Sequence, residues 1–299
     1  MKKILKYSFT YYLTIQVLKL KGIKNLFKQD PVPYLKVRKE DVYTPKKKQF
    51  KGFEVSKIKI IDSEITQIKP KKNSKELLLF VHGGAFISGP AQHHWDSICE
   101  ILKQTNYNGW MCNYPKAPEN KISKISQNID EIYENALKEY SAKQITLIGD
   151  SVGATLIIAL IQRLEQKGKT TPKQLILVTP VMDASMSNTE IIKYDKLDPM
   201  LSKRGILSSK KMCAENNDLN DEKISPINGS FNGFPKTLLF TAEHDIMYPD
   251  QILAIDKMKN STLEFKVING EGMPHIWPFL PVMKESRIAL KQIIDFLKN

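Results

Sequence analysis

The chain has 299 residues, of which 41% are hydrophobic and 26% charged, a composition that is ordinary for a folded enzyme of one large domain or two small ones. Lysine and arginine number 45 against 32 aspartates and glutamates, so the formal net charge is +13. The lysines are scattered along the chain and no nucleic-acid-binding module accompanies them. We therefore expect a solvated basic surface and no nucleic-acid partner.

The three cysteines, Cys99, Cys112 and Cys213, are far apart and odd in number, so they suggest neither a disulfide framework nor a zinc or redox pair. We expect buried thiols and a reducing, cytoplasmic setting. The sequence contains no phosphate-binding loop, dinucleotide fingerprint or metal-ligand cluster. It therefore predicts no cofactor and no metal.

The first segment, residues 1–28, is basic and apolar, with seven lysines and no acid. Its uncharged run, residues 7–18, contains four polar residues and no cleavage site follows it, so we expect a retained amphipathic helix and not a signal peptide. The run is also too short to span a bilayer. We favour a helix whose apolar face closes a pocket as part of a cap. The alternative is a weak association of residues 1–28 with an anionic membrane surface.

After a Pro- and Lys-rich connector at residues 30–48, segments with strand character alternate with segments with helical character. The expected strands cover residues 53–61, 64–69, 76–84, 109–115, 145–149, 174–183, 237–245 and 263–270. The expected helices cover residues 92–104, 125–140, 152–168, 251–259 and 284–299. This alternation predicts a mostly parallel sheet with helices on both faces. The polar segment 184–233 breaks the rhythm and is expected to cross over the top of the sheet.

In open sheets of this kind, ligands bind beyond the carboxyl ends of the strands. Three expected strand ends carry residues of interest, namely Ser151, Asp245 and the HGGAF loop that begins at His82. His275 lies in the Gly/Pro-rich loop after the last strand. We therefore expect a functional site built from these four places.

Ser151 lies in the run Gly149-Asp150-Ser151-Val152-Gly153, which satisfies G-x-S-x-G. Small neighbours permit a strained strand-to-helix turn that exposes the serine hydroxyl and points the Val152 amide at a substrate oxygen. The alternative is a tight turn in which the serine only caps the helix. The strand before the motif and the helix after it favour a nucleophile.

A serine hydroxyl needs a base and an acid that orients the base, and in this fold the chain order is serine, acid, histidine. Of the five histidines, only His275 follows both the serine and a strand-end acid. Asp245, just past a strand, is the expected acid. Asp250 suits a helix cap better, and Glu243 is a minor competitor. His82 precedes the serine, so we expect it to hold its loop by hydrogen bonds.

Several segments resemble the hormone-sensitive-lipase-like (family IV) α/β-hydrolase carboxylesterases. They are FVHGGAFISG, NYPKAPEN, GDSVGA, SPI, AEHDIMYPD and GMPHIWPF, in the order found in that family. The resemblance covers about residue 75 to the C-terminus. It implies a single α/β-hydrolase domain over residues 1–299, with a helical cap formed by about 1–50 and 184–233.

The resemblance also implies roles for particular residues. Ser151 is expected to be the nucleophile, Asp245 the orienting acid and His275 the base. The oxyanion hole is expected from the loop residues and Val152, that is, from Gly83, Gly84, Ala85 and Val152. Alanine at 85, where the family has glycine, is tolerable if its φ is negative. Val152 and Ala154 also depart from the family pattern and leave the substrate range open.

The implied activity is hydrolysis of carboxylic esters with small to medium acyl chains through an acyl-enzyme intermediate. The same residues could serve an amidase, a peptidase or a deacetylase. A hydrolase fold kept as a non-catalytic small-molecule receptor would be expected to lack one of the three catalytic residues, and all three are present. The expected partner is a small-molecule ester, and a homodimer is left open.

Overall fold

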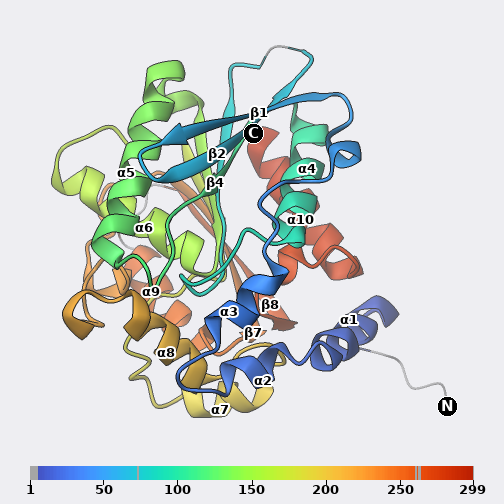
Figure 1. Cartoon of the computed structure of the whole chain (residues 1–299), viewed down its shortest axis with the longest axis vertical. Coiled ribbons are helices and arrows are strands. Elements are labelled where there is room, and N and C mark those ends of the chain that lie inside the picture. Colours follow the sequence, from blue (N-terminus) through green and yellow to red (C-terminus); the bar gives the residue numbers. More distant parts are fainter. Residues whose placement is uncertain (1–5, 73, 260, 262–263, 299) are drawn as a thin grey trace.

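The computed structural model describes residues 6–72, 74–259, 261 and 264–298. Eight strands form one sheet in the order β1-β2-β4-β3-β5-β6-β7-β8 (Figure 1). Their bounds are β1 (Phe53–Ile60), β2 (Ser63–Pro70), β3 (Leu77–Val81), β4 (Asn108–Asn113), β5 (Ile145–Asp150), β6 (Gln174–Val178), β7 (Lys236–His244) and β8 (Phe265–Pro274). β2 is antiparallel to β1 and β4, and all other neighbours are parallel. The mostly parallel sheet predicted from the alternating segments is confirmed.

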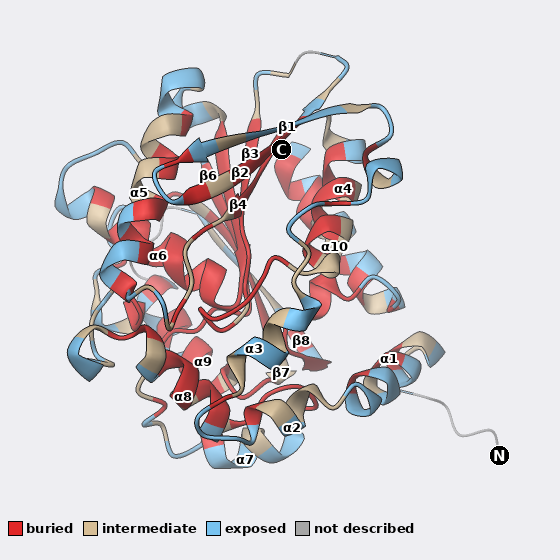
Figure 2. Ribbon diagram, viewed as in Figure 1, coloured by how far each residue is buried: buried red, intermediate tan, exposed pale blue. Residues whose placement is uncertain are grey.

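Helices cover both faces of the sheet (Figure 1). One layer contains α4 (Gln92–Thr105) and α10 (Lys284–Lys298), and the other contains α5 (Ile122–Glu139), α6 (Val152–Gln166) and α9 (Tyr248–Lys259). The central strands β3, β5 and β6 are buried along their whole length, as expected for apolar runs covered on both sides (Figure 2). The carboxyl ends of these parallel strands lie at one end of the molecule.

Two remote parts of the chain lie together at that end. The first contains α1 (Phe9–Leu20), α2 (Ile23–Phe27) and α3 (Tyr34–Val37), and the second contains α7 (Ile191–Leu197) and α8 (Lys203–Cys213) (Figure 1). α2 packs against α8, and the Val32 N–H donates a hydrogen bond to Ser208 Oγ at 3.0 Å. Short 3₁₀ helices lie at Arg38–Glu40, Lys47–Phe50, Ala142–Gln144, Glu215–Asn217, Pro226–Asn228 and Trp277–Phe279.

The N-terminal segment differs from the single helix expected over residues 1–28. Residues 1–5 lie outside the described chain, and the rest forms α1 and α2, separated at Gly22, whose φ of +65° ends the first helix and turns the chain. α1 packs against the end of β8 and against α10, and the Tyr11 hydroxyl donates to the Gly272 carbonyl at 2.9 Å. Within the described chain, no helix has both the length and the apolar character needed to cross a membrane.

The three cysteines are free and buried, as expected. Burial raises the pKa of the Cys99, Cys112 and Cys213 thiols. These groups are therefore protonated and unreactive near neutral pH.

Candidate active site

Ser151 lies in the sharp turn between β5, which ends at Asp150, and α6, which begins at Val152. Its φ of 51° and ψ of −127° are sparsely populated by residues other than glycine, and such strain is found at functional turns. The glycines of the motif let this turn pack against β3, because a Cβ on Gly149 would lie 2.7 Å from the Val81 carbonyl oxygen and one on Gly153 closer still. The Ser151 side chain makes no capping hydrogen bond to α6, so the helix-cap alternative is not supported.

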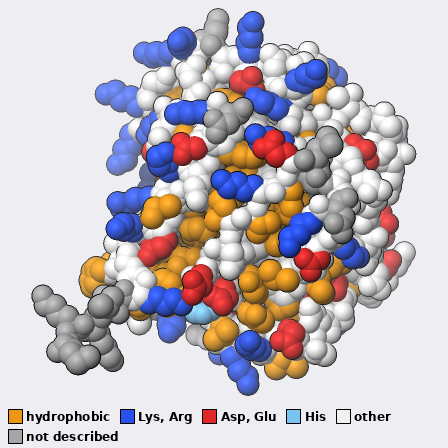
Figure 3. Space-filling view, turned by 180° about the vertical axis from the view of Figure 1, so that it is seen from behind, with side chains coloured by type: hydrophobic (Ala, Val, Ile, Leu, Met, Phe, Trp, Pro, Cys, Tyr) orange, Lys and Arg blue, Asp and Glu red, His pale blue; other side chains and the backbone are white. Residues whose placement is uncertain are grey.

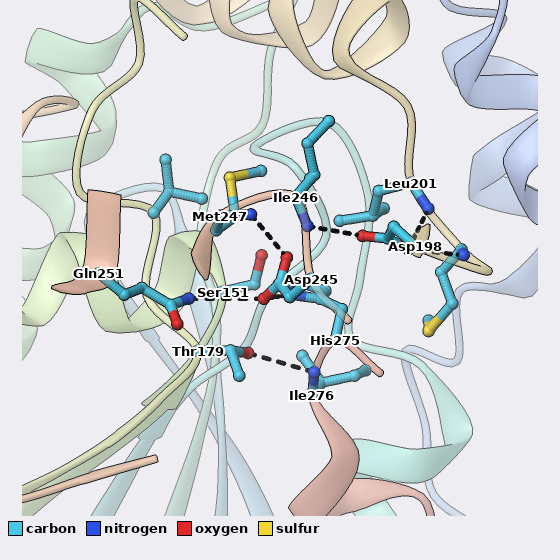
Figure 4. Close-up of polar contacts among 12 residues, drawn as sticks. Ser151, Thr179, Asp198, Leu201, Asp245, Ile246, Met247, Gln251, His275 and Ile276 are labelled. Carbon is cyan, nitrogen blue, oxygen red and sulfur yellow. Dashed lines mark hydrogen bonds and ion pairs between the residues drawn. The ribbon is translucent and has the colours of Figure 1, made fainter. Parts of the chain in front are cut away.

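His275 and Asp245 form a buried pair next to this turn (Figure 4). The His275 Nδ1–H donates to Asp245 Oδ2 at 2.7 Å, and the carboxylate also accepts the backbone N–H of Met247 at 2.9 Å. The Gln251 amide lies 3.4 Å from Asp245 Oδ2. Burial acts to lower the pKa of His275, but the charge and hydrogen bond of Asp245 outweigh it, so the pKa is raised. With its proton held on Nδ1, the imidazole has Nε2 available as a base.

The competing acids serve elsewhere. Glu243 accepts the backbone N–H of Gly272 at 2.7 Å, which fixes the irregular end of β8. Asp250 lies inside the first turn of α9 and not at its cap, and it accepts a hydrogen bond from Asn188 at 2.9 Å. The expected helix-capping role of Asp250 is therefore wrong. Of the three candidate acids at and after the end of β7, it is Asp245 that contacts His275.

The sequence reasoning missed another buried carboxylate, Asp198, which lies between α7 and α8. Its Oδ1 accepts the N–H groups of Met200 at 2.7 Å and Leu201 at 2.8 Å, and its Oδ2 accepts that of Ile246 at 3.0 Å (Figure 4). Asp198 therefore connects the segment between α7 and α8 to the loop that carries Asp245. Burial and the nearby charge of Asp245 raise the pKa of Asp198 to about 7.

Thr179, at the end of β6, is a second missed residue. Its Oγ1 accepts the backbone N–H of Ile276 at 3.2 Å and so fixes the chain directly after His275 (Figure 4). Both Thr179 and Ile276 have positive φ, 43° and 53°. No local sequence pattern marks either residue, because the contact joins positions 97 residues apart.

The HGGAF loop lies on the other side of Ser151. The Gly83 N–H donates to Asp150 Oδ1 at 3.0 Å, which takes this donor out of the expected oxyanion hole. Gly84 and Ala85 line the same pocket as Val152. The φ of Gly84 is +123° and that of Ala85 is +55°, so the negative φ assumed for an alanine at this position is wrong.

Histidines beneath this loop support it. His82 Nδ1 lies 2.6 Å from the Gly83 carbonyl oxygen and its ring stacks on Tyr114 with 4.5 Å between centroids, which confirms the structural role expected of His82. His94 Nδ1 accepts the Ala91 N–H, so its Nε2 carries the proton that faces Asp150 at 3.2 Å. Burial acts to raise the pKa of Asp150, but its electrostatic interaction and hydrogen bond with the His94 ring outweigh burial, so the pKa is lowered.

One group near the site has ligand atoms spaced closely enough for a metal ion. The ligand atoms of His93, His94 and Asp150 lie within 4.8 Å of one another. The Asp150 carboxylate is already engaged by His94 and by the Gly83 N–H. Burial lowers the pKa of His93 to about 3, so that this ring is neutral. The contacts of Asp150 and His94 are therefore those of residues that hold the HGGAF loop in place. We keep the expectation that the reaction needs no metal.

A cavity of about 340 Å³ opens beside Ser151 and His275. Its wall is mostly apolar and includes Ile23, Leu26, Phe27, Val37, Val181, Met200, Leu201, Ile206 and Met247. Lys210 also borders the cavity, but its ammonium donates to the Asp183 carbonyl at 3.1 Å, and burial lowers its pKa to about 7. Within the described chain the lining begins at Lys21, so α2 closes the pocket and α1 does not.

Comparison with known proteins agrees with this geometry. A family model described as alpha/beta hydrolase fold matches residues 78–279. An esterase of Acinetobacter venetianus is 26% identical over 234 residues, which are 77% of each chain. The crystal structure of a Staphylococcus aureus protein assigned as an esterase superposes with a TM-score of 0.86 at 25% identity, covering 96% of this chain and 99% of that one. An esterase of the bacterial hormone-sensitive lipase family superposes with a TM-score of 0.84 at 18% identity, covering 98% of each chain.

Proposed function

The chain belongs to the alpha/beta hydrolase fold family, and from that premise we propose that it is a hormone-sensitive-lipase-like serine carboxylesterase that cleaves small to medium acyl esters. One observation carries this proposal. Ser151, in a strained turn, and His275, which is paired with the buried Asp245, both line the same mostly apolar cavity. The mostly apolar wall of the cavity suits an acyl chain, and Ser151 and His275 lie on it where the ester bond would break.

In the proposed reaction, Ser151 Oγ attacks the ester carbonyl carbon while His275 Nε2 takes the hydroxyl proton. Asp245 stabilises the imidazolium that results. The oxyanion is expected to accept hydrogen bonds from the backbone N–H groups of Gly84, Ala85 and Val152. His275 returns its proton to the departing alcohol, which leaves an acyl group on Ser151. Water, activated by the same histidine, then releases the carboxylic acid and restores the serine.

The cavity supports the proposed range of acyl chains. The side chains of Phe27 and Ile206, contributed by the two parts of the cap, belong to its apolar wall together with those of the sheet end. An amide or peptide substrate would use the same residues, so we propose the ester on the agreement with related esterases. A cytoplasmic location is part of the proposal and is supported by three free thiols. The homodimer stays a prediction.

Replacement of Ser151 by alanine tests the proposal. We expect turnover of p-nitrophenyl esters to fall by about 10⁴- to 10⁶-fold, because a nucleophile in such a group supplies rate enhancement of that order. A fluorophosphonate probe should label the wild type at Ser151 and leave the variant unlabelled. Ser187→Ala, at an exposed serine of the cap, is the matched control and should change neither result.

A graded series of acyl esters, with the matching anilides, reports the substrate class in the same assay. We expect ester turnover to peak at short or medium chains and anilide turnover to be much slower. Ester turnover by Ser151→Ala within tenfold of the wild type would overturn the proposed function. A preference for anilides would replace the esterase proposal by an amidase.

A further inference from the structure

α1 is apolar on two sides, and the described residues cover only one of them. Tyr11, Thr14 and Leu18 are buried against the body of the molecule. On the opposite side Phe9 is 74% exposed and Leu20 is 86% exposed, and Leu13 and Val17 are each nearly half exposed. At about 100° of rotation per residue, these four exposed side chains fall within an arc of about 80°. We call them the outer stripe (Phe9, Leu13, Val17 and Leu20).

The outer stripe continues toward neighbouring elements of the cap. Leu35 on α3 and Ile192 and Leu197 on α7 are also exposed large hydrophobic residues. α1, α2, α3 and α7 lie at the same end of the molecule in Figure 1, and Figure 2 shows exposed residues along them. Single exposed hydrophobic residues are ordinary on a protein surface, but a set of them aligned on one helix marks an interaction site.

The charged residues that the N-terminal segment contributes beside the outer stripe are all lysines, although Glu40, Glu271 and Glu285 of other elements also lie next to this segment. Residues 1–29 contain seven lysines and no acid. Lys6 pairs with Glu271 and Lys21 with Glu40, while Lys19 and Lys28 are exposed. Figure 3 shows hydrophobic side chains with basic and acidic ones between them on the face of the molecule that is turned away in Figure 1. An apolar stripe among lysines is complementary to an anionic lipid surface, on which acyl chains lie beneath negative headgroups.

The end of the outer stripe adjoins the mouth of the active-site cavity. α1 ends at Leu20, and the next residue, Lys21, lines the cavity together with Lys36, Lys39 and Glu40. The ion pair between Lys21 and Glu40, with a distance of 3.1 Å, therefore connects the end of α1 to the rim of the pocket. A surface that covered the outer stripe would lie beside the pocket mouth.

We propose that the outer stripe docks this protein on an anionic lipid membrane, so that the pocket mouth receives esters held in that membrane. The proposal of docking is argued from the surface of α1 and does not depend on any catalytic activity. The proposal that the substrates are esters rests on the proposed function. A second copy of the chain is a poorer occupant, because two such stripes in contact would bring two sets of lysines together.

Vesicle sedimentation with the full chain carrying Ser151→Ala tests docking without any turnover. The protein should sediment with vesicles that contain phosphatidylglycerol, less with pure phosphatidylcholine, and less again at high salt. The triple variant Phe9→Ser, Leu13→Ser, Leu20→Ser should lower partitioning by at least a hundredfold, since each immersed side chain contributes on the order of tenfold. The matched control is Leu253→Ser, Val282→Ser, Ile288→Ser, at exposed sites on and near α9 and α10, and it should bind like the parent.

Turnover then tests the substrate. With Ser151 present, the triple variant should hydrolyse a soluble butyrate ester at the rate of the wild type. Its turnover of an ester embedded in anionic vesicles should be at least tenfold lower than that of the wild type. Equal sedimentation of the triple variant and its parent, or an absence of vesicle binding by the parent, would overturn docking. A dimer seen by sedimentation velocity and lost in the triple variant would also overturn it, in favour of a second copy. Vesicle binding without any turnover of either ester would leave docking standing and refute the proposed function.

Discussion

Replacement of Asp198 by asparagine should change how the stability of this protein depends on pH. Asp198 is buried and accepts three backbone N–H groups, two within the cap and one beside Asp245. Burial, followed by the charge of Asp245, raises its pKa from 3.8 to about 7. The folded protein therefore holds a proton on Asp198 at pH values where the unfolded chain releases it.

The sign and size of the effect follow from this shift. Because the folded-state pKa lies above the unfolded value, the contribution of Asp198 to stability is complete below pH 4 and is lost as the pH rises through 7. At 1.36 kcal/mol for each unit of pKa, the loss is about 4 kcal/mol. Asparagine does not titrate, but its amide cannot accept the Ile246 N–H, which costs about 1–3 kcal/mol at every pH. The variant should thus be less stable than the wild type at pH 4 and more stable, by about 1–3 kcal/mol, at pH 8.5.

Urea unfolding of both proteins across this pH range provides the measurement. The free energy of unfolding of the variant minus that of the wild type reports Asp198 together with its interaction with His275, because titrating groups that Asp198 does not affect contribute equally to both curves. A difference that does not change with pH would refute the assignment of a raised pKa to Asp198. A kinetic readout should agree, since the charge of Asp198 helps to raise the pKa of His275. The acidic limb of kcat/KM should therefore move to lower pH in the variant.

Three further substitutions test the catalytic geometry. Asp245→Asn should lower kcat by about 10⁴-fold, because it leaves His275 in the wrong tautomer. Asp250→Asn affects a contact with Asn188 and should lower kcat less than tenfold. The reverse ranking of the two variants in steady-state assays would assign the orienting acid to position 250. Ala85→Gly should keep normal turnover and change the free energy of unfolding by no more than about 1 kcal/mol, because the φ of +55° suits glycine at least as well as alanine. A large loss of activity in a folded Ala85→Gly enzyme would show that the methyl group is needed.

Local patterns were enough to predict the sheet and the residues at its strand ends. Buried strands appear as short apolar runs, and a serine between two glycines at the end of such a run marks a turn whose cause is visible in the packing of Gly149 and Gly153 against β3. The pairing of His275 with Asp245 followed from chain order and from elimination among five histidines. These features depend on neighbours in sequence or on the topology of the fold.

The remaining features depend on contacts that no local pattern encodes. Asp198 lies in a polar segment and gains its meaning only from Ile246, 48 residues later. The sign of φ at Ala85 follows from the path of a whole loop, and the N–H of Gly83 is taken by Asp150 from another strand end. The described part of residues 1–28 forms two helices, of which α1 leaves the outer stripe exposed and α2 lines the pocket. A prediction of this division would have had to recognise Gly22 as a helix break.

The position of α1 on the folded chain also sets an order of events during synthesis. Its seat is made from the last part of the sequence, because the Tyr11 hydroxyl donates to the carbonyl of Gly272 and the backbone N–H of Ser8 donates to Glu285, 277 residues later. At about 5–20 residues per second, roughly 14 to 55 seconds separate the emergence of the helix from that of its partners. Throughout that interval both apolar sides of α1 face solvent, so the nascent chain needs more protection from chaperones than the finished protein does.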